Sequence, residues 1–365
     1  MRLKRITYEN FRNHRSLTFE PSDDITLIYG ENGSGKTSIL EGVLYCALTR
    51  GFVGATDSEC LSFLSDYFLL DSNFLGESDN AVNVKITYKK EKEKQVIVNN
   101  SEIKPFSRHI GRIPCVTFSP QELVIVNGSP SERRRFLDNA MSQTDRRYLD
   151  NLLDFRRVLQ QRNALLAQWQ DRNKVQQEML SLWTEQLSRV SSSIVSARVR
   201  FLASFFDYFS KLYSQFSLDE QPAITYRSSL GKITEKTSTE DLYNRFLGRF
   251  NETRQQEIMR SQTMTGPHRD DLLFLINEKE IKKYASQGQL RTFLICLKLS
   301  LHQFFYDTLG EKPLCLLDDI FSELDESRCA DIVSILQNCG QTIITSAEKK
   351  FQGKLTVISI GSLKK

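Results

Sequence analysis

The chain has 365 residues and a net charge of +4, and 40% of its residues are hydrophobic and 26% charged. This composition is typical of a soluble globular protein. The length predicts a principal domain with a second, smaller body. The mild positive charge permits a nucleic-acid partner but does not require one.

The sequence has no features of a membrane protein, a secreted protein or a disulfide-rich protein. No apolar run approaches the roughly 18 residues of a membrane span, and residues 1–6 lack the apolar core of a signal peptide. The seven cysteines form no C-x-x-C pair and have no nearby set of histidine ligands in the sequence, so we expect neither a disulfide scaffold nor a zinc site. These features predict a reduced, cytoplasmic protein.

Residues 1–130 have the pattern of the first half of an α/β domain. Short apolar or alternating runs predict strands at Arg2–Tyr8, Leu17–Phe19, Ile25–Tyr29, Val82–Tyr88, Gln95–Val98 and Ile113–Phe118.

The stretch after Ile25–Tyr29 reads G-x-x-x-x-G-K-T and is followed by a helix-like run from Ser38 to Leu48. A strand, a glycine loop and a helix form a phosphate-binding loop, in which backbone N–H groups surround an anion. The lysine would reach the β- and γ-phosphates of ATP and the threonine hydroxyl would ligate Mg²⁺. We therefore expect nucleotide-binding residues at Gly30, Glu31, Asn32, Gly33, Ser34, Gly35, Lys36 and Thr37.

Residues 131–222 predict a helical arm, because no glycine occurs between Gly128 and Gly231 and no proline between Pro130 and Pro222. Two helices of about 30 Å each, separated by the polar stretch Gln170–Gln177, could form an antiparallel pair. Two helices packed flat on the main domain are the alternative. The two apolar seams are Tyr148, Leu152, Phe155, Leu159, Leu166 and Trp169, with Arg162 as the polar interruption, and Leu180, Trp183, Leu187, Val190, Ile194, Ala197 and Phe201.

Residues 223–365 predict the second half of the α/β domain. Strands are expected at Ala223–Tyr226, Asp271–Ile276, Leu314–Leu317 and Thr342–Thr345, and helices at Arg291–Phe305 and Glu326–Gln337. Helices that alternate with short apolar strands on both sides of the insertion predict one mostly parallel sheet built from both chain ends.

The expected strand Leu314–Leu317 ends in two adjacent carboxylates. Asp318 is placed to hold Mg²⁺ through water, and Asp319 to orient or deprotonate the water that attacks ATP. We therefore expect Lys36 and Asp319 as the catalytic residues.

Three further motifs resemble those of ATP-binding-cassette ATPases. Ser286-Gln287-Gly288-Gln289 resembles the signature motif, Ser322-Glu323-Leu324-Asp325 the D-loop, and Pro120-Gln121 the glutamine loop. The resemblance implies that Ser286 and Gly288 bind the nucleotide of a second subunit, and that Gln121 joins Thr37 and Asp318 as a metal ligand. ATP would then hold a head-to-head dimer together, and hydrolysis would open it.

Within the SMC-like branch of that class, the chain resembles the RecF family of bacterial recombination and gap-repair proteins. The matching residues are Asn10–Asn13, Gly30–Thr37, Gly128–Pro130, Arg133–Asp138, Thr265–Asp271, Ser286–Thr292, Leu317–Asp319 and Ser322–Asp325. The chain departs from the family at Gln121, where an acidic residue is usual, and at Ser38, where Asn or a similar polar residue is usual.

The resemblance implies a weak DNA-dependent ATPase of recombinational repair, with ATP and Mg²⁺ as ligands, RecR and RecO as partners and RecA acting downstream. The DNA would be single-stranded or a gapped duplex. An ATP-gated scaffold that recruits repair proteins, with incidental hydrolysis, is the alternative, and a phosphate-loop kinase or transporter subunit is disfavoured by the signature-like motif.

DNA contacts are less defined by the sequence. Between residues 129 and 165 the eight arginines outnumber the five acids by three, and such a face could bind phosphates non-specifically. Pairing of these arginines with the intervening acids is an equally open alternative. The arginines are Arg133, Arg134, Arg135, Arg146, Arg147, Arg156, Arg157 and Arg162.

Overall fold

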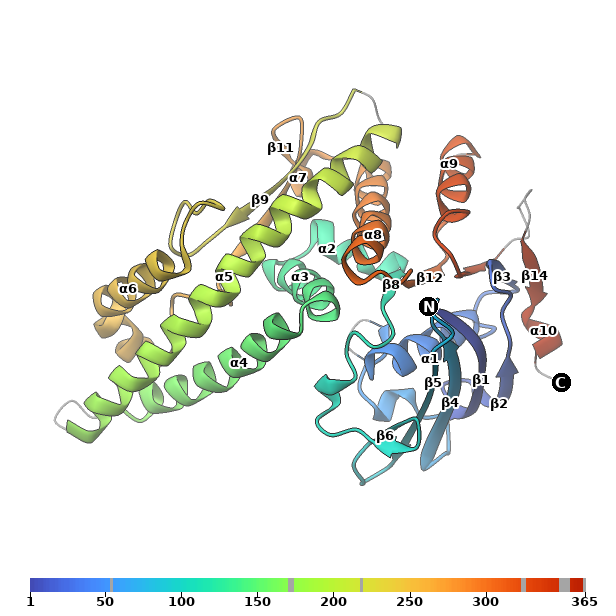
Figure 1. Cartoon of the computed structure of the whole chain (residues 1–365), viewed down its shortest axis with the longest axis horizontal. Helices are drawn as coiled ribbons and strands as arrows, with labels where there is room; N and C mark the ends of the chain where they lie inside the picture. The colour runs from blue at the N-terminus through green and yellow to red at the C-terminus, as the bar shows by residue number, and fades with distance from the viewer. Residues whose placement is uncertain (53–54, 170–173, 217–218, 323–325, 348–354, 364–365) are drawn as a thin grey trace. The chain divides into compact units, whose positions relative to one another are not determined.

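The computed structural model describes residues 1–52, 55–169, 174–216, 219–322, 326–347 and 355–363. The chain divides into two compact units. The first contains residues 1–123 and 286–365, and the second contains residues 124–285. Both chain ends therefore belong to the first unit (Figure 1).

A parallel sheet of five strands forms the centre of the first unit, in the order β14-β3-β13-β12-β8. Its central strands are buried on both faces, which explains why they appear in the sequence as continuous apolar runs. The prediction of a parallel sheet built from both chain ends is confirmed. The strands are β3 (Ile25–Tyr29), β8 (Cys115–Phe118), β12 (Leu314–Asp318), β13 (Thr342–Ser346) and β14 (Thr356–Ser359).

An antiparallel sheet of six strands forms the other layer of this unit, in the order β2-β1-β4-β5-β6-β7. Helix α1 (Lys36–Leu48) contacts strands of both sheets and is buried on almost every side. Burial on all sides explains its lack of a polar face. The strands are β1 (Arg2–Phe11), β2 (His14–Phe19), β4 (Tyr67–Leu75), β5 (Ala81–Lys89), β6 (Gln95–Val98) and β7 (Ser101–Glu102).

The remaining α-helices of the first unit come from residues 286–365, and its 3-10 helices come from residues 1–123. Helix α8 (Gln287–Leu309) is buried continuously from Leu290 to His302, which matches the predicted apolar helix there. The others are α9 (Glu326–Leu336), α10 (Ile360–Leu363) and the 3-10 helices η2 (Ser58–Cys60), η3 (Phe106–Arg108) and η4 (Pro120–Leu123).

The second unit combines long helices with a small antiparallel sheet in the order β11-β10-β9. Its elements are α2 (Val124–Asn127), α3 (Pro130–Thr144), α4 (Arg146–Ala167), α5 (Lys174–Phe216), β9 (Pro222–Arg227), α6 (Thr239–Arg260), β10 (Asp271–Ile276), β11 (Lys279–Glu280) and α7 (Ile281–Tyr284).

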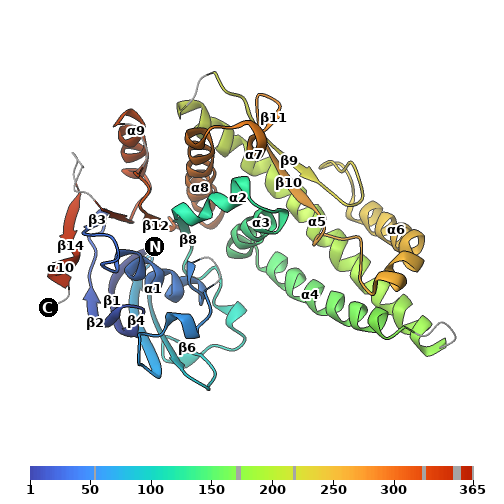
Figure 2. The same cartoon turned by 180° about the vertical axis from the view of Figure 1, so that it is seen from behind.

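Helices α4 and α5 pack side by side and run in opposite directions (Figure 2). The early α4 residue Tyr148 contacts Arg198 late in α5, and Arg162 contacts Thr184 early in α5. The antiparallel pair is therefore confirmed. Helix α5 has 43 residues and a length of about 64 Å, about twice the predicted length. The expected linker Gln170–Gln177 lies partly outside the described residues, and α5 has begun by Lys174.

The domain boundary predicted at residue 222 differs from the structure. Residues 223–285 belong to the second unit, because β9 pairs with β10 and packs on α5. The strand patterns were correct, but a strand pattern does not identify the sheet that the strand joins.

Arg162, the polar interruption of the first seam, is an element of the core. Its side chain is 1% exposed and donates to the Glu257 carboxylate at 2.6 Å, to Thr184 and to Thr263. Its guanidinium also lies 4.8 Å from the centroid of the Phe250 ring. The ion pair therefore connects α4 with α6 in the interior of the second unit.

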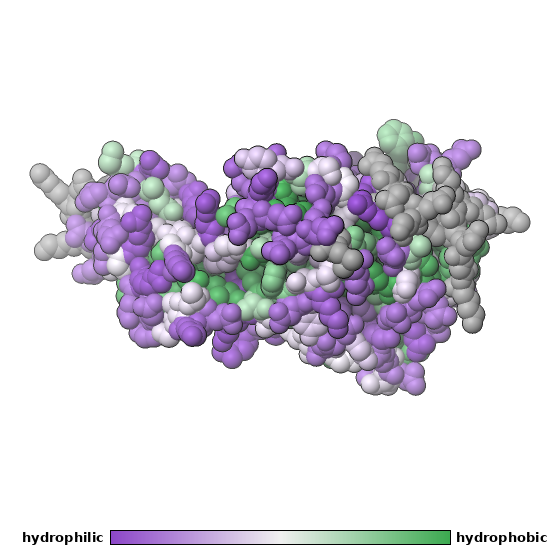
Figure 3. Space-filling view, turned by 90° about the horizontal axis from the view of Figure 1, so that it is seen from above, coloured by the Kyte–Doolittle hydropathy of each residue, from purple (hydrophilic) through white to green (hydrophobic). Residues whose placement is uncertain are grey.

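In the part of the chain that the structure describes, no helix is long and apolar enough to cross a membrane. The face shown in Figure 3 is mainly hydrophilic, with smaller groups of hydrophobic residues between the polar ones.

We predict that Arg162→Met lowers the free energy of unfolding by about 3–5 kcal/mol, because it leaves the Glu257 carboxylate buried without its cation. Urea unfolding followed by circular dichroism measures the change. The control is Arg157→Met on the same helix, whose ion pair with Asp154 is exposed and whose loss should cost at most about 1 kcal/mol. Equal losses in the two variants would contradict the role assigned to Arg162.

Candidate nucleotide site

The predicted phosphate loop connects β3 to the N-terminus of α1. Gly33 and Gly35 adopt φ values of 77° and 102°, in the left-handed region that favours glycine. A Cβ atom on Gly35 would lie 2.5 Å from the side chain of Asn13, so any other residue there would displace that side chain in addition to straining the backbone. The loop conformation therefore depends on these glycines.

The Lys36 ammonium lies inside this loop. Its Nζ donates to the carbonyl oxygens of Gly30 at 2.7 Å and Glu31 at 2.8 Å. Burial lowers the pKa of Lys36, and the carboxylates of Asp319 and Asp318 oppose that effect. The cation thus lies where an anion in the loop would become its partner.

Asp318, at the end of β12, is held by two hydroxyl groups. Thr37 Oγ1 donates to its Oδ1 at 2.8 Å and Thr345 Oγ1 donates to the same atom at 2.6 Å. Burial raises the pKa of Asp318, and these two hydrogen bonds oppose the rise. The predicted proximity of the acidic strand end to the phosphate loop is therefore present in the structure.

Asp319 has a φ of 46°, in the left-handed region, where aspartate is more common than most other residues. Its N–H donates to the carbonyl of Thr345 at 3.1 Å, and its own carbonyl accepts from Arg291 Nη2 at 3.1 Å. Arg291 also donates to Ser322 Oγ at 2.7 Å. The backbone on each side of the carboxylate is thus fixed by hydrogen bonds.

These elements enclose a cavity of about 310 Å³ in the first unit. The predicted site residues that line this cavity are Asn32, Gly33, Gly35, Lys36, Thr37, Asp318 and Asp319. Gly30, Glu31 and Ser34 belong to the phosphate loop but do not line the cavity. The cavity is lined by Asn13, Asn32, Gly33, Gly35, Lys36, Thr37, Ser38, Pro120, Asp318, Asp319, Thr345 and Ala347.

The lining also contains residues to which the sequence analysis assigned no role. Asn13 was noted as part of a family motif, but only the fold shows that it contacts the phosphate loop. Its neighbour Arg12 makes two 2.6 Å hydrogen bonds to the Glu41 carboxylate on α1, which attaches this turn to the helix. The sequence predicts Thr345 only as the end of a strand, whereas the structure shows that its hydroxyl donates a hydrogen bond to Asp318.

The signature-like residues do not line this cavity among the described residues. Ser286 is the exposed N-cap of α8, where its Oγ accepts from the Gln289 N–H at 3.2 Å and its own N–H donates to Gln289 Oε1 at 2.8 Å. A Cβ on Gly288 would lie 3.2 Å from Arg328. The signature-like residues thus stand at the start of α8, and the capping box pairs the backbone N–H groups of Ser286 and Gln289.

Gln121 is exposed and does not line the cavity, whereas its neighbour Pro120 does. Its assignment as a metal ligand remains a prediction. The acidic group of this segment is Glu122, which accepts from Lys298 on α8 at 2.5 Å, with both side chains largely buried. The D-loop-like stretch is described only at Ser322, and Glu323–Asp325 lie outside the described residues.

The Gly-Pro-His-Arg-Asp-Asp block belongs to the second unit and has partners within it. Asp271 accepts two hydrogen bonds from Arg133, at 2.8 and 3.0 Å. Buried Asp270 accepts from Tyr226 OH and from the Ser229 N–H. The block therefore holds the second unit together.

These contacts reduce the arginine face proposed from the sequence. Arg133 and Arg162 are buried ion-pair partners, and Arg134 donates to the Asp270 carbonyl. Three others pair with acids one helical turn away, namely Arg135 with Glu132, Arg146 with Asp150 and Arg157 with Asp154. The pairing alternative thus accounts for most of the cluster.

The donors at the cavity fit a phosphate group with Mg²⁺. The Thr37 and Asp318 oxygens are 2.8 Å apart, close to the edge of about 2.9 Å between neighbouring oxygens around Mg²⁺. Ser34 Oγ is buried without a hydrogen-bond partner among the described residues, so an anion in the loop would satisfy it.

Comparison with known proteins agrees with this geometry. A family model described as an AAA domain matches residues 5–355. The DNA replication and repair protein RecF of Chlorobium phaeovibrioides (strain DSM 265 / 1930) is 56% identical over 350 residues, which cover 96% of this chain and 94% of the relative. The RecF protein of Chlorobium luteolum (strain DSM 273 / BCRC 81028 / 2530) is 53% identical over 363 residues, which cover 100% of this chain and 98% of the relative.

Solved structures show the same relationship. A structure of the recombination mediator protein RecF with ATP, in the RecFOR pathway, matches with a TM-score of 0.91 and 31% identity, covering 98% of this chain and 96% of that one. An Smc head bound to the C-winged helix domain of ScpA matches with a TM-score of 0.55 and 13% identity, covering 96% and 90%, and shows a likeness of fold alone. The resemblance inferred from the motifs is therefore confirmed, and the chain belongs to the RecF family of DNA replication and repair proteins.

Proposed function

We propose that this chain is an ATP-dependent DNA-binding protein of recombinational repair and replication-gap processing, which dimerises on DNA when ATP is bound. The observation that carries the proposal is the cavity in which the phosphate loop, Thr37 and the two aspartates meet. The RecF neighbour solved with ATP supports ATP as the nucleotide.

Five residues of the cavity have separate tasks in binding and hydrolysis. Lys36 exchanges the carbonyls of Gly30 and Glu31 for the β- and γ-phosphate oxygens. Thr37 and Asp318 hold Mg²⁺, and Thr345 keeps the Asp318 carboxylate in position. When bound, Mg²⁺ supplies positive charge to the phosphates. Asp319 orients the attacking water or accepts its proton.

The signature residues act on the nucleotide of a second copy of the chain. Ser286 is exposed, Gly288 is half-buried and neither lines the cavity, so in a head-to-head dimer they are available to the γ-phosphate held by the partner. The positive end of a 23-residue helix favours such an anion. ATP is then part of the interface between the two copies.

DNA and protein partners follow from family membership. The solved RecF structures are of a recombination mediator in the RecFOR pathway, which supports RecR and RecO as partners of this chain and a role in loading the recombinase RecA. Within the second unit, Arg147 and Arg156 have no ion pair among the described residues and are exposed, so they are the arginines of the cluster most available to DNA phosphates.

We predict that ATP with Mg²⁺ and gapped DNA shifts the mass in solution from 42.2 kDa toward twice that value. Lys36→Met should abolish ATP binding and the shift, whereas Ser286→Arg should bind ATP but remain a monomer, because the arginine blocks the partner's γ-phosphate. Light scattering with size-exclusion chromatography and fluorescent-ATP binding are the measurements. The control is Ser101→Arg, at an exposed edge of the same unit. A mass that does not change with ATP would contradict the proposal.

Hydrolysis should be slow, because the aspartate side chain at 319 is one methylene shorter than the glutamate of most cassette ATPases. We predict that Asp319→Asn lowers ATP turnover by about 100-fold and lengthens the lifetime of the ATP-bound dimer, with Asp307→Asn on the exposed face of α8 as the control. Turnover assays and dimer dissociation kinetics measure both effects. An unchanged turnover would exclude this role of Asp319, and slower turnover with an unchanged dimer lifetime would favour a scaffold in which hydrolysis is incidental.

A further inference from the structure

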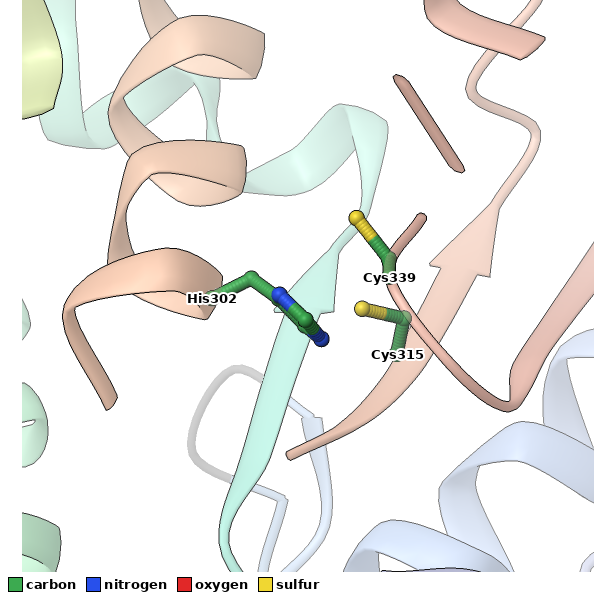
Figure 4. A group of neighbouring side chains, drawn as sticks. All are labelled: His302, Cys315 and Cys339. Atoms are coloured by element: carbon green, nitrogen blue, oxygen red, sulfur yellow. The ribbon is translucent and has the colours of Figure 1, made fainter. Parts of the chain in front are cut away.

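Three residues distant in the sequence meet in the interior of the first unit. His302 lies on α8, Cys315 on β12 and Cys339 in the connection from α9 to β13. The side chains are 3%, 0% and 5% exposed, respectively. One nitrogen of His302 and the two sulfur atoms all lie within 4.8 Å of one another. Figure 4 shows both cysteine side chains beside the imidazole ring.

The three side chains provide a set of soft metal ligands. Two thiols and an imidazole favour Zn²⁺ or Cu(I) over Mg²⁺, which prefers oxygen ligands. Within the described residues, His302 Nε2 is buried and has no hydrogen-bond partner. A buried ring nitrogen without a partner is costly, and a metal ion would satisfy it.

The separations are close to those of a zinc site. With bonds of about 2.3 Å to sulfur and about 2.0 Å to nitrogen, tetrahedral ligands lie about 3.5–3.7 Å apart. The widest separation here is at most 4.8 Å, so side-chain movements of about 1 Å bring the three atoms into range. Sets of two cysteines and one histidine hold zinc in some enzymes, with water in the fourth position.

The charge of the complex distinguishes the two soft cations. Binding displaces a proton from each thiol to solvent, which leaves two thiolates and a neutral imidazole. With Zn²⁺ the total charge is zero, whereas with Cu(I) a net negative charge would be buried at side chains that are at most 5% exposed, and of the described residues only the nearby Lys312 would offset its cost. We propose that His302, Cys315 and Cys339 form a binding site for one Zn²⁺ ion, separate from the Mg²⁺ position at the phosphate loop.

Two of the three elements that such an ion would connect lead to the nucleotide cavity, and the third carries the signature-like residues. Helix α8 begins at Ser286, β12 ends at Asp318, and β13 carries Thr345, which holds Asp318. A Zn²⁺ ion bound at His302, Cys315 and Cys339 fixes the distance between the signature helix and these two strands.

The sequence could not reveal this set. The ligands are separated by 13 and 24 positions, without the short spacing of a C-x-x-C motif. Cys315 lies within the apolar run Leu314–Leu317, and Cys339 lies between Asn338 and Gly340, so neither has a second ligand nearby in the sequence. Only the parallel pairing of β12 with β13 brings the segment after α9 beside Cys315.

The test uses Co²⁺ as an optical probe in the full-length protein, purified with a reducing agent and stripped of metal by a chelator. We expect one equivalent of Co²⁺ to produce a thiolate charge-transfer band and tetrahedral d–d bands, and one equivalent of Zn²⁺ to abolish them. Zn²⁺ should also raise the melting temperature of the stripped protein.

Cys315→Ala and Cys339→Ala should lose the charge-transfer band and the Zn²⁺-dependent rise in melting temperature. Cys296→Ala, which removes another fully buried thiol from α8, should retain both. The wild-type titration is decisive even if a variant fails to fold. Absence of the bands at saturating Co²⁺, or bands that persist in both ligand variants, would overturn the proposal.

Discussion

The hydrogen bond from Thr37 to Asp318 joins two residues that are 281 positions apart in the chain. It can form only because β3 and β12 both pair with β13 in one parallel sheet, so that the carboxyl ends of the first and last segments meet at the same edge. The phosphate loop, the two aspartates and Thr345 are all placed by that edge. The first unit is therefore complete only when the residues that follow the second unit add β12, β13 and β14 to the parallel sheet.

The second unit is held together by buried charge. Arg162 pairs with Glu257, Arg133 with Asp271 and Arg198 with Asp138, and each pair joins elements that are distant in the sequence. Arg198, 2% exposed, also donates to Tyr148 and to the Pro267 carbonyl. Charged residues in this region thus serve mainly to fix the helices and the small sheet, which leaves a smaller set of arginines for phosphates.

Much of the fold and of the candidate site could be predicted because the relevant signals are local. The strand Ile25–Tyr29, the glycine loop, the buried strand before Asp318 and the N-cap at Ser286 each depend on a few adjacent residues. The rest depends on contacts between distant segments, which no local pattern contains. Arg162 is a polar interruption of an apolar seam in the sequence, and only the fold shows that Glu257 is its partner. Strand β10 pairs with β9 and not with the parallel sheet. The contact of Asn13 with the phosphate loop likewise depends on the fold.

In the proposed dimer, the phosphate loop of one copy and the signature helix of another share one nucleotide. Mixing Lys36→Met with Ser286→Arg protein tests it directly, since a mixed dimer has one site with both substitutions and one site with neither. Mass photometry with ATP, Mg²⁺ and gapped DNA measures the dimer fraction, with each variant alone as the reference. The account predicts dimers in the mixture and monomers in each variant alone. A mixture that remains monomeric would contradict it.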